Sequence, residues 1–135
     1  MIKRVDHISM AVESIEEAMK LFVDLFGARV AEDSREEEDG YRWVTLDIGS
    51  QGAQLELLEP LEGSDGFVSR FLAQRGEGFH HVTLETPDIL AAMTQLKAAG
   101  IEPFHTRLTN PAWKETFVHP RQGHGVLYQL CEREH

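Results

Sequence analysis

The stretch GEGFHHVTLETPDILAAM, residues 76–93, decides the fold because it repeats the opening stretch VDHISMAVESIEEAM, residues 5–19. With an offset of 74 residues (81 minus 7), His81 falls on His7, and the apolar positions of the two stretches coincide. Each stretch begins with alternating residues typical of a strand and continues with apolar residues at helical spacing. The sequence therefore predicts two copies of one structural unit, joined by a short connecting segment.

The sequence of the first copy predicts secondary-structure elements in the order β-α-β-β-β. Ser14, with Glu17 three residues later, is typical of a capping box, and the apolar stripe that follows runs to Leu25. Gly27 supplies the left-handed residue that often ends a helix. We expect the acidic run at residues 32–40 to form a solvated loop between strands. The predicted elements are a strand over residues 5–12, a helix over 15–25, and strands over 28–31, 41–48 and 54–58.

The second copy predicts the same order. We expect Thr86 to cap its helix, Pro87 to occupy the first helical position and Gly100 to end it. A short helix over residues 67–75, which ends at Gly76, is expected to connect the two copies. The predicted strands of the second copy lie at residues 80–85, 101–105, 114–118 and 126–131.

The composition of the 135-residue chain fits one compact domain, or two small halves that share a core. The net charge of −10 and the scattered basic residues argue against nucleic acid as a partner, because phosphate binding requires a clustered basic surface. No apolar run approaches the roughly 20 residues that cross a bilayer, and the N-terminus lacks the apolar core of a signal peptide. A single cysteine, Cys131, excludes an intramolecular disulfide. We therefore expect a cytoplasmic protein that does not bind membranes.

Four polar side chains occupy equivalent positions in the two copies. Because side chains alternate across a strand, these four lie on the strand face opposite to the helices, with Ser9 and Thr83 beside them to hydrate or steer a bound group. If the copies join around a pseudo-twofold axis, the four converge in a concave trough and form a suitable set for a divalent ion such as Co, Ni, Zn, Mn or Fe. The alternative is that each histidine is simply packed or hydrogen-bonded. The four residues are His7, Glu56, His81 and Gln129.

The openings DHI and HHV, with the phrases ELLEP, GEGFHHV and HP…GHGVLYQL, resemble the vicinal oxygen chelate superfamily of glyoxalases, bleomycin resistance proteins and dioxygenases. The likeness extends from about Val5 to Glu132 and is greatest to the methylmalonyl-CoA epimerase-like branch. It implies an α+β fold in which two βαββ(β) modules pair about a pseudo-twofold axis and form a cupped mixed sheet with the helices outside. The implied single domain covers residues 1–135, with module one at about 3–60, a connecting helix at about 64–76 and module two at about 78–133.

The resemblance also implies a site and an assembly. Carried over, the metal ligands fall on His7, Glu56, His81 and Gln129, and a homodimer is expected. The chain departs from the family pattern at Gln129 and Trp43, where epimerases usually carry glutamates. Glu56 is the only carboxylate left in the set, so we expect it to be the catalytic base.

The leading functional hypothesis is a metal-dependent isomerase or epimerase that removes an α-proton next to a metal-chelated carbonyl, with an acyl-CoA thioester as a candidate substrate. The alternatives are a glyoxalase I-like lyase acting on a thiol hemithioacetal, an Fe(II) dioxygenase, and a non-catalytic module that binds small molecules. A single base acting on one face favours suprafacial isomerisation. Epimerisation needs a second proton donor, for which Tyr41, His124 and water are candidates.

Overall fold

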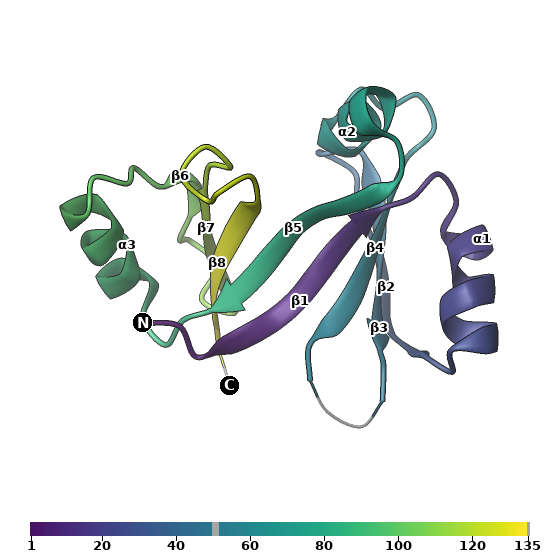
Figure 1. Ribbon diagram of the computed structural model, residues 1–135, viewed down its shortest axis with the longest axis horizontal. Coiled ribbons are helices and arrows are strands. Elements are labelled where there is room, and N and C mark those ends of the chain that lie inside the picture. Colours follow the sequence, from purple (N-terminus) through teal and green to yellow (C-terminus); the bar gives the residue numbers. More distant parts are fainter. Residues whose placement is uncertain (50–51, 135) are drawn as a thin grey trace. The chain divides into compact units, whose positions relative to one another are not determined.

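The computed structural model describes residues 1–49 and 52–134, which fall into two compact units (Figure 1). One unit comprises residues 1–6 together with the chain from His81 onwards, and the other comprises residues 7–80. Strands β1 (Arg4–Ala11) and β5 (Gly78–Glu85) contribute to both units, because the unit boundaries fall inside them.

The order of elements predicted for each half is confirmed. In the unit of residues 7–80 the strands are ordered β2 (Arg29–Glu36), β3 (Tyr41–Asp47), β4 (Gln54–Pro60) and β1. In the other unit they are ordered β5, β8 (Leu127–Arg133), β7 (Trp113–Val118) and β6 (Phe104–Arg107). Two parallel pairs, β1 with β4 and β5 with β8, combine with antiparallel hairpins into a mixed sheet of the predicted α+β class. No helix within residues 1–49 and 52–134 is long and apolar enough to cross a membrane. The helical elements are α1 (Ile15–Met19), the π-helix η1 (Lys20–Leu25), α2 (Phe67–Arg75) and α3 (Ile89–Ala98).

Helices cover both faces of the strands within the unit of residues 7–80. On one face, α1 and η1 pack over a core that includes Val12, Val44, Leu46 and Leu57. On the other face, the predicted connecting helix α2 packs through Val68 and Leu72 over a second cluster. The second cluster also contains Ala11, Leu58, Tyr41, Trp43, Phe67 and Phe71. The predicted alternation of β1 and β4 is thus confirmed, and their polar positions face away from α1.

The first helix differs from the prediction in its second half. Ser14 caps it as expected by accepting a hydrogen bond from the Glu17 N–H at 3.2 Å. After Met19 the chain continues as a π-helix, in which the Phe26 N–H donates to the Leu21 carbonyl five residues earlier. The wider π turn rotates later residues away from the core. Leu25 was predicted to lie on the apolar stripe and is instead 77% exposed.

The expectation of a solvated loop at residues 32–40 is wrong for its first half. Strand β2 continues through the acidic run to Glu36, and a turn follows at residues 37–40. β2 is an edge strand whose side chains are almost all exposed, so charged residues are compatible with it and discourage unwanted strand pairing. Arg42 on the neighbouring strand holds Asp33 through two hydrogen bonds.

The start of α3 lies two residues later than predicted. Asp88 is the N-cap, and its side chain accepts a hydrogen bond from the Ala91 N–H at 3.0 Å. Thr86 and Pro87 precede the helix, and Thr86 Oγ1 accepts a hydrogen bond from the Asp88 N–H at 3.4 Å. Both threonine and aspartate are good caps, so the sequence offered two candidate starts. Gly100, with φ of 84°, follows the helix as expected.

Candidate functional site

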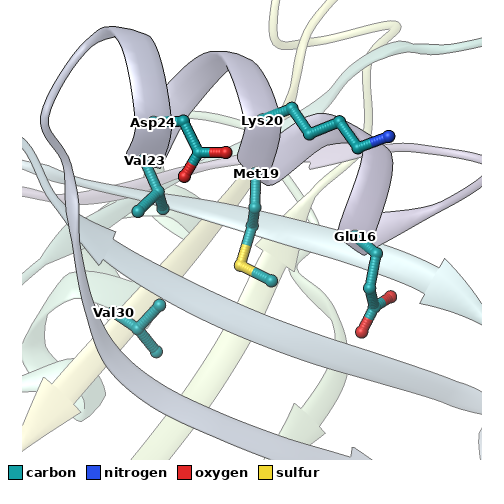
Figure 2. Close-up of a pocket in the computed structure, with 6 residues that line it drawn as sticks. All are labelled: Glu16, Met19, Lys20, Val23, Asp24 and Val30. Carbon is teal, nitrogen blue, oxygen red and sulfur yellow. The ribbon is translucent and has the colours of Figure 1, made fainter.

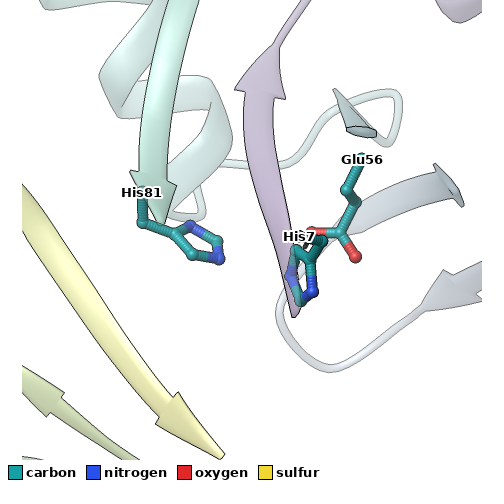
Figure 3. Close-up of side chains that lie close together, drawn as sticks. All are labelled: His7, Glu56 and His81. Atoms are coloured by element: carbon teal, nitrogen blue, oxygen red, sulfur yellow. Dashed lines mark ion pairs between the residues drawn. The ribbon is translucent and has the colours of Figure 1, made fainter. Parts of the chain in front are cut away.

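His7 and Glu56 lie next to each other in the unit of residues 7–80. The parallel strands β1 and β4 place Ser9 opposite Glu56, and His7 lies two residues before Ser9 on the same strand face. His7 Nε2 is 3.5 Å from Glu56 Oε1 (Figure 3). His7 is only 5% exposed. The structure therefore brings two of the predicted ligands into direct contact.

Ser9 holds the Glu56 carboxylate in place. The Ser9 hydroxyl donates a hydrogen bond to Glu56 Oε1 at 2.7 Å, and Ser9 is fully buried. A carboxylate that is largely removed from water needs such donors, because desolvation of an unpaired charge is costly. The bond directs the same oxygen, Oε1, toward both Ser9 and His7.

The other unit contains an equivalent arrangement. Parallel β5 and β8 place Thr83 opposite Gln129, and Thr83 Oγ1 donates to Gln129 Oε1 at 2.7 Å. His81 lies two residues before Thr83 on β5 (Figure 3), and its ring packs edge-on against Phe117. His81, Thr83 and Gln129 are all buried. Each unit thus contains a buried histidine on the same strand face as a hydroxyl that donates to a predicted oxygen ligand.

Ser9 and Thr83 each bond to one of the predicted ligands. The sequence placed them beside the site to hydrate or steer a bound group, which stays a prediction, and the structure adds their hydrogen bonds to Glu56 and Gln129. Their repeat-equivalent positions, 74 residues apart, were a usable signal. Their partners depend on the register of parallel strands, and the sequence does not reveal this register.

Trp43 and Tyr41 belong to the second core cluster. Trp43 pairs with Leu58 across β3 and β4, and it packs in the cluster under α2. Tyr41 packs edge-on against Phe67, with ring centroids 5.1 Å apart. Trp43 therefore places an aromatic side chain in an apolar cluster, at a position where the family pattern expects a glutamate.

Two titratable residues within two positions of the predicted ligands have packing roles. His80, which precedes His81, packs against the rings of Phe67 and Phe71. Burial, with a smaller contribution from Arg75, lowers the pKa of His80 to about 4, so its imidazole is neutral at pH 7. Burial also raises the pKa of the Cys131 thiol to about 12. Cys131 is therefore a small buried residue whose thiol stays protonated near neutral pH.

A surface pocket lies elsewhere in the unit of residues 7–80, between the first helical segment and β2 (Figure 2). Met19 and Val23 point from the helical segment toward Val30 on β2. The pocket has a volume of about 410 Å³ and contains none of the predicted site residues. Its remaining lining residues are Glu16, Lys20 and Asp24.

Comparisons with known proteins all point to one superfamily. The family model of the glyoxalase/bleomycin resistance protein/dioxygenase superfamily matches residues 6–118. The chain is 34% identical over 130 residues to the mitochondrial methylmalonyl-CoA epimerase of Mus musculus, covering 94% of this chain and 71% of that protein. It is 31% identical over 140 residues to the mitochondrial methylmalonyl-CoA epimerase of Dictyostelium discoideum, covering 98% and 80%. A variant of the Streptomyces coelicolor methylmalonyl-CoA epimerase, in complex with 2-nitronate-propionyl-CoA, matches with a TM-score of 0.88 and 29% identity over 100% of both chains.

These similarities confirm the predicted family resemblance, the fold class and the prediction of an enzyme of the isomerase or epimerase type. The assignment of all four metal ligands stays a prediction.

Proposed function

Because the chain belongs to the glyoxalase/bleomycin resistance protein/dioxygenase superfamily, we propose that it is a metal-dependent isomerase or epimerase that acts on an acyl-CoA thioester. The observation that carries the proposal is the pair of half-sites, each with a buried histidine and an oxygen ligand held by a hydroxyl. The substrate class is supported by the relatives, which are methylmalonyl-CoA epimerases, one of them in complex with 2-nitronate-propionyl-CoA.

The proposed metal site combines the two half-sites. Two ligands bonded to one ion at about 2.0–2.2 Å lie about 3.0–3.5 Å apart, and His7 Nε2 and Glu56 Oε1 are 3.5 Å apart. Imidazole, carboxylate and amide oxygen suit Co, Ni, Zn, Mn and Fe. When bound, such an ion stabilises negative charge that develops on a substrate carbonyl oxygen. The proposed ligands are His7, Glu56, His81 and Gln129. The two histidines would bind the ion through an imidazole nitrogen and Glu56 through a carboxylate oxygen. Gln129 would bind it through its amide oxygen.

Glu56 is the proposed catalytic base. It is the only carboxylate among the four proposed ligands, and a carboxylate can remove an α-proton once it lies within about 3 Å of it. Ser9 fixes the position of Glu56 Oε1 and thereby the direction of the second carboxylate oxygen. Glu56 is partly exposed, with 15% of its side chain accessible, so a substrate can reach it.

Gln129 and Trp43 stand where epimerases usually carry glutamates, and this restricts the stereochemistry of the proposed reaction. Neither the Gln129 amide nor the Trp43 indole exchanges protons as an acid or base near neutral pH. One base therefore serves one face of the substrate, and we expect suprafacial proton transfer to be faster than inversion at the α-carbon.

The proposal is tested by incubating metal-loaded protein with methylmalonyl-CoA and other acyl-CoA thioesters in deuterated water. The wild-type protein should incorporate deuterium at the α-carbon. Glu56→Gln should retain the metal, because an amide oxygen is still a ligand, and should lose the exchange by at least about 10²-fold. Exchange at the wild-type rate in Glu56→Gln would remove Glu56 as the base. No exchange by wild-type protein with any thioester would contradict the proposed function.

The homodimer and the cytoplasmic location stay predictions from the sequence and the resemblance. Sedimentation of the purified protein would test the first. Cell fractionation would test the second.

A further inference from the structure

Thr45 lies on the same strand face as Glu56. Val44 and Leu46, its neighbours on β3, are fully buried in the core under α1 and η1. Because side chains alternate along a strand, Thr45 faces the opposite side. The antiparallel register of β3 with β4 places Thr45 directly across from Glu56, and side chains of such pairs lie about 5 Å apart at Cβ.

Within the described part of the chain, the Thr45 hydroxyl has no hydrogen-bond partner. Among the residues that the structure describes, Thr45 Oγ1 is the only buried side-chain nitrogen or oxygen without a hydrogen bond. The comparable buried hydroxyls at Ser9, Thr83 and Thr116 are all bonded. A buried hydroxyl without a partner is destabilising, so its presence is explained most simply by a partner that arrives with a ligand.

The burial of Thr45 fits contact with a substrate that reaches Glu56. Thr45 is 5% exposed, which is the same fraction as His7, the proposed metal ligand on the same face. Both side chains are therefore equally buried, and their strands lie on either side of the strand of Glu56 in the order β1-β4-β3.

The charges around Thr45 restrict what its hydroxyl can bind. The register places Glu56 on one side of Thr45 and Glu32, on β2, on the other. The bound ion would offset the charge of Glu56, whereas the Glu32 carboxylate would still repel a substrate carboxylate at this position. A neutral oxygen, as in a hydroxyl or a carbonyl group, accepts a hydrogen bond from Thr45 without this repulsion.

On the basis of the proposed function, we propose that Thr45 Oγ1 donates a hydrogen bond to a neutral oxygen on the acyl chain of the substrate. Thr45 is then a specificity-determining residue that selects acyl thioesters carrying a hydroxyl or a carbonyl group over their unsubstituted counterparts. A site built to bond such an oxygen discriminates against analogues that lack it, because its own polar group is then left unpaired.

The test compares the affinities of metal-loaded protein for 3-hydroxybutyryl-CoA and butyryl-CoA, which differ by one hydroxyl group. Wild-type protein should bind the hydroxylated thioester at least about tenfold more tightly. Thr45→Val, which keeps the shape and removes the hydroxyl, should bring the ratio close to one, and Thr45→Ser should retain it. Metal content should be the same in all three proteins.

A matched control checks the structural premise without any ligand. Thr45→Val should not lower the melting temperature, since no hydrogen bond is lost, whereas Thr116→Val should lower it, because Thr116 is bonded to Thr106. An affinity ratio that Thr45→Val leaves unchanged would overturn the role of Thr45 while α-proton exchange still supports the proposed function. Wild-type protein that neither binds nor exchanges any acyl-CoA thioester would overturn both.

Discussion

At the scale of single residues, the hydroxyls of Ser9 and Thr83 orient the side chains of the proposed oxygen ligands. Each donates a 2.7 Å hydrogen bond to its partner, Glu56 or Gln129, and each is fully buried. Such contacts restrict the ligand to one orientation, so less conformational entropy is lost when an ion binds. The two copies thus share the orienting hydroxyls as well as the positions of the proposed ligands.

Ser9→Ala and Thr83→Val should each lower the affinity for a divalent ion by roughly 10- to 100-fold, because the ligand oxygen loses its orienting donor. The Co(II) absorption spectrum and a metal titration would measure the effect. Ser9→Thr and Thr83→Ser keep the hydroxyl and should restore most of the affinity. Equal affinity in wild-type protein and both hydroxyl-free variants would show that the hydroxyls have no role in the site.

Gln129→Glu should change the stereochemical outcome. The variant gains a carboxylate in the half-site that lacks one, so a second acid or base becomes available. We expect the ratio of α-carbon inversion to α-proton exchange to rise by at least about tenfold, as measured by chiral analysis of the thioester product. Gln129→Asn, which adds no charge, is the control. An unchanged ratio in Gln129→Glu would show that a different group limits inversion.

At the scale of elements, the two helices that follow the first strand of each copy begin in the same way. The Ile15 N–H donates to Glu59 Oε1 and the Ile89 N–H donates to Glu132 Oε1, both at 2.9 Å. Each glutamate comes from the last strand of the same copy and lies at a helix N-terminus, where a negative charge is favourable. These contacts tie the helix start to the strand that carries Glu56 or Gln129.

Glu59→Gln should therefore destabilise the fold by about 1 kcal/mol, because a charge-assisted hydrogen bond at a helix start is weakened. Urea denaturation of wild type and variant would measure it. Glu62→Gln changes an exposed glutamate in the same region and should leave stability unchanged. Equal stability of Glu59→Gln and Glu62→Gln would contradict the role of this contact.

The elements also show which features the sequence can predict. Alternation along β1 and β4 placed His7 and Glu56 on the correct face, because a two-residue period is preserved wherever one face is buried. The π turn before Gly27 was not predictable, since one inserted residue barely alters an apolar pattern over two turns. The continuation of β2 over residues 32–36 was missed, because an edge strand needs no apolar face and these residues have a composition typical of a loop.

The role of Thr45 could not be predicted from the sequence either. Its residue type is common in strands and carries no signal of its own. Only the register of β3 with β4, together with the absence of a hydrogen-bond partner within the described residues, singles it out.

At the scale of the whole molecule, the central claim is that one ion takes ligands from both copies of the repeat. His7 and Glu56 belong to the unit of residues 7–80, and His81 and Gln129 belong to the other. A chain with such a site should bind one ion, and loss of a ligand from either unit should remove that same ion.

The most direct measurement is the number of divalent ions bound per chain in wild-type protein and in the single variants His7→Ala and His81→Ala. The account predicts one ion per wild-type chain and almost none in either variant, with the fold retained by circular dichroism. Two ions per wild-type chain, or full metal retention in His81→Ala, would contradict it.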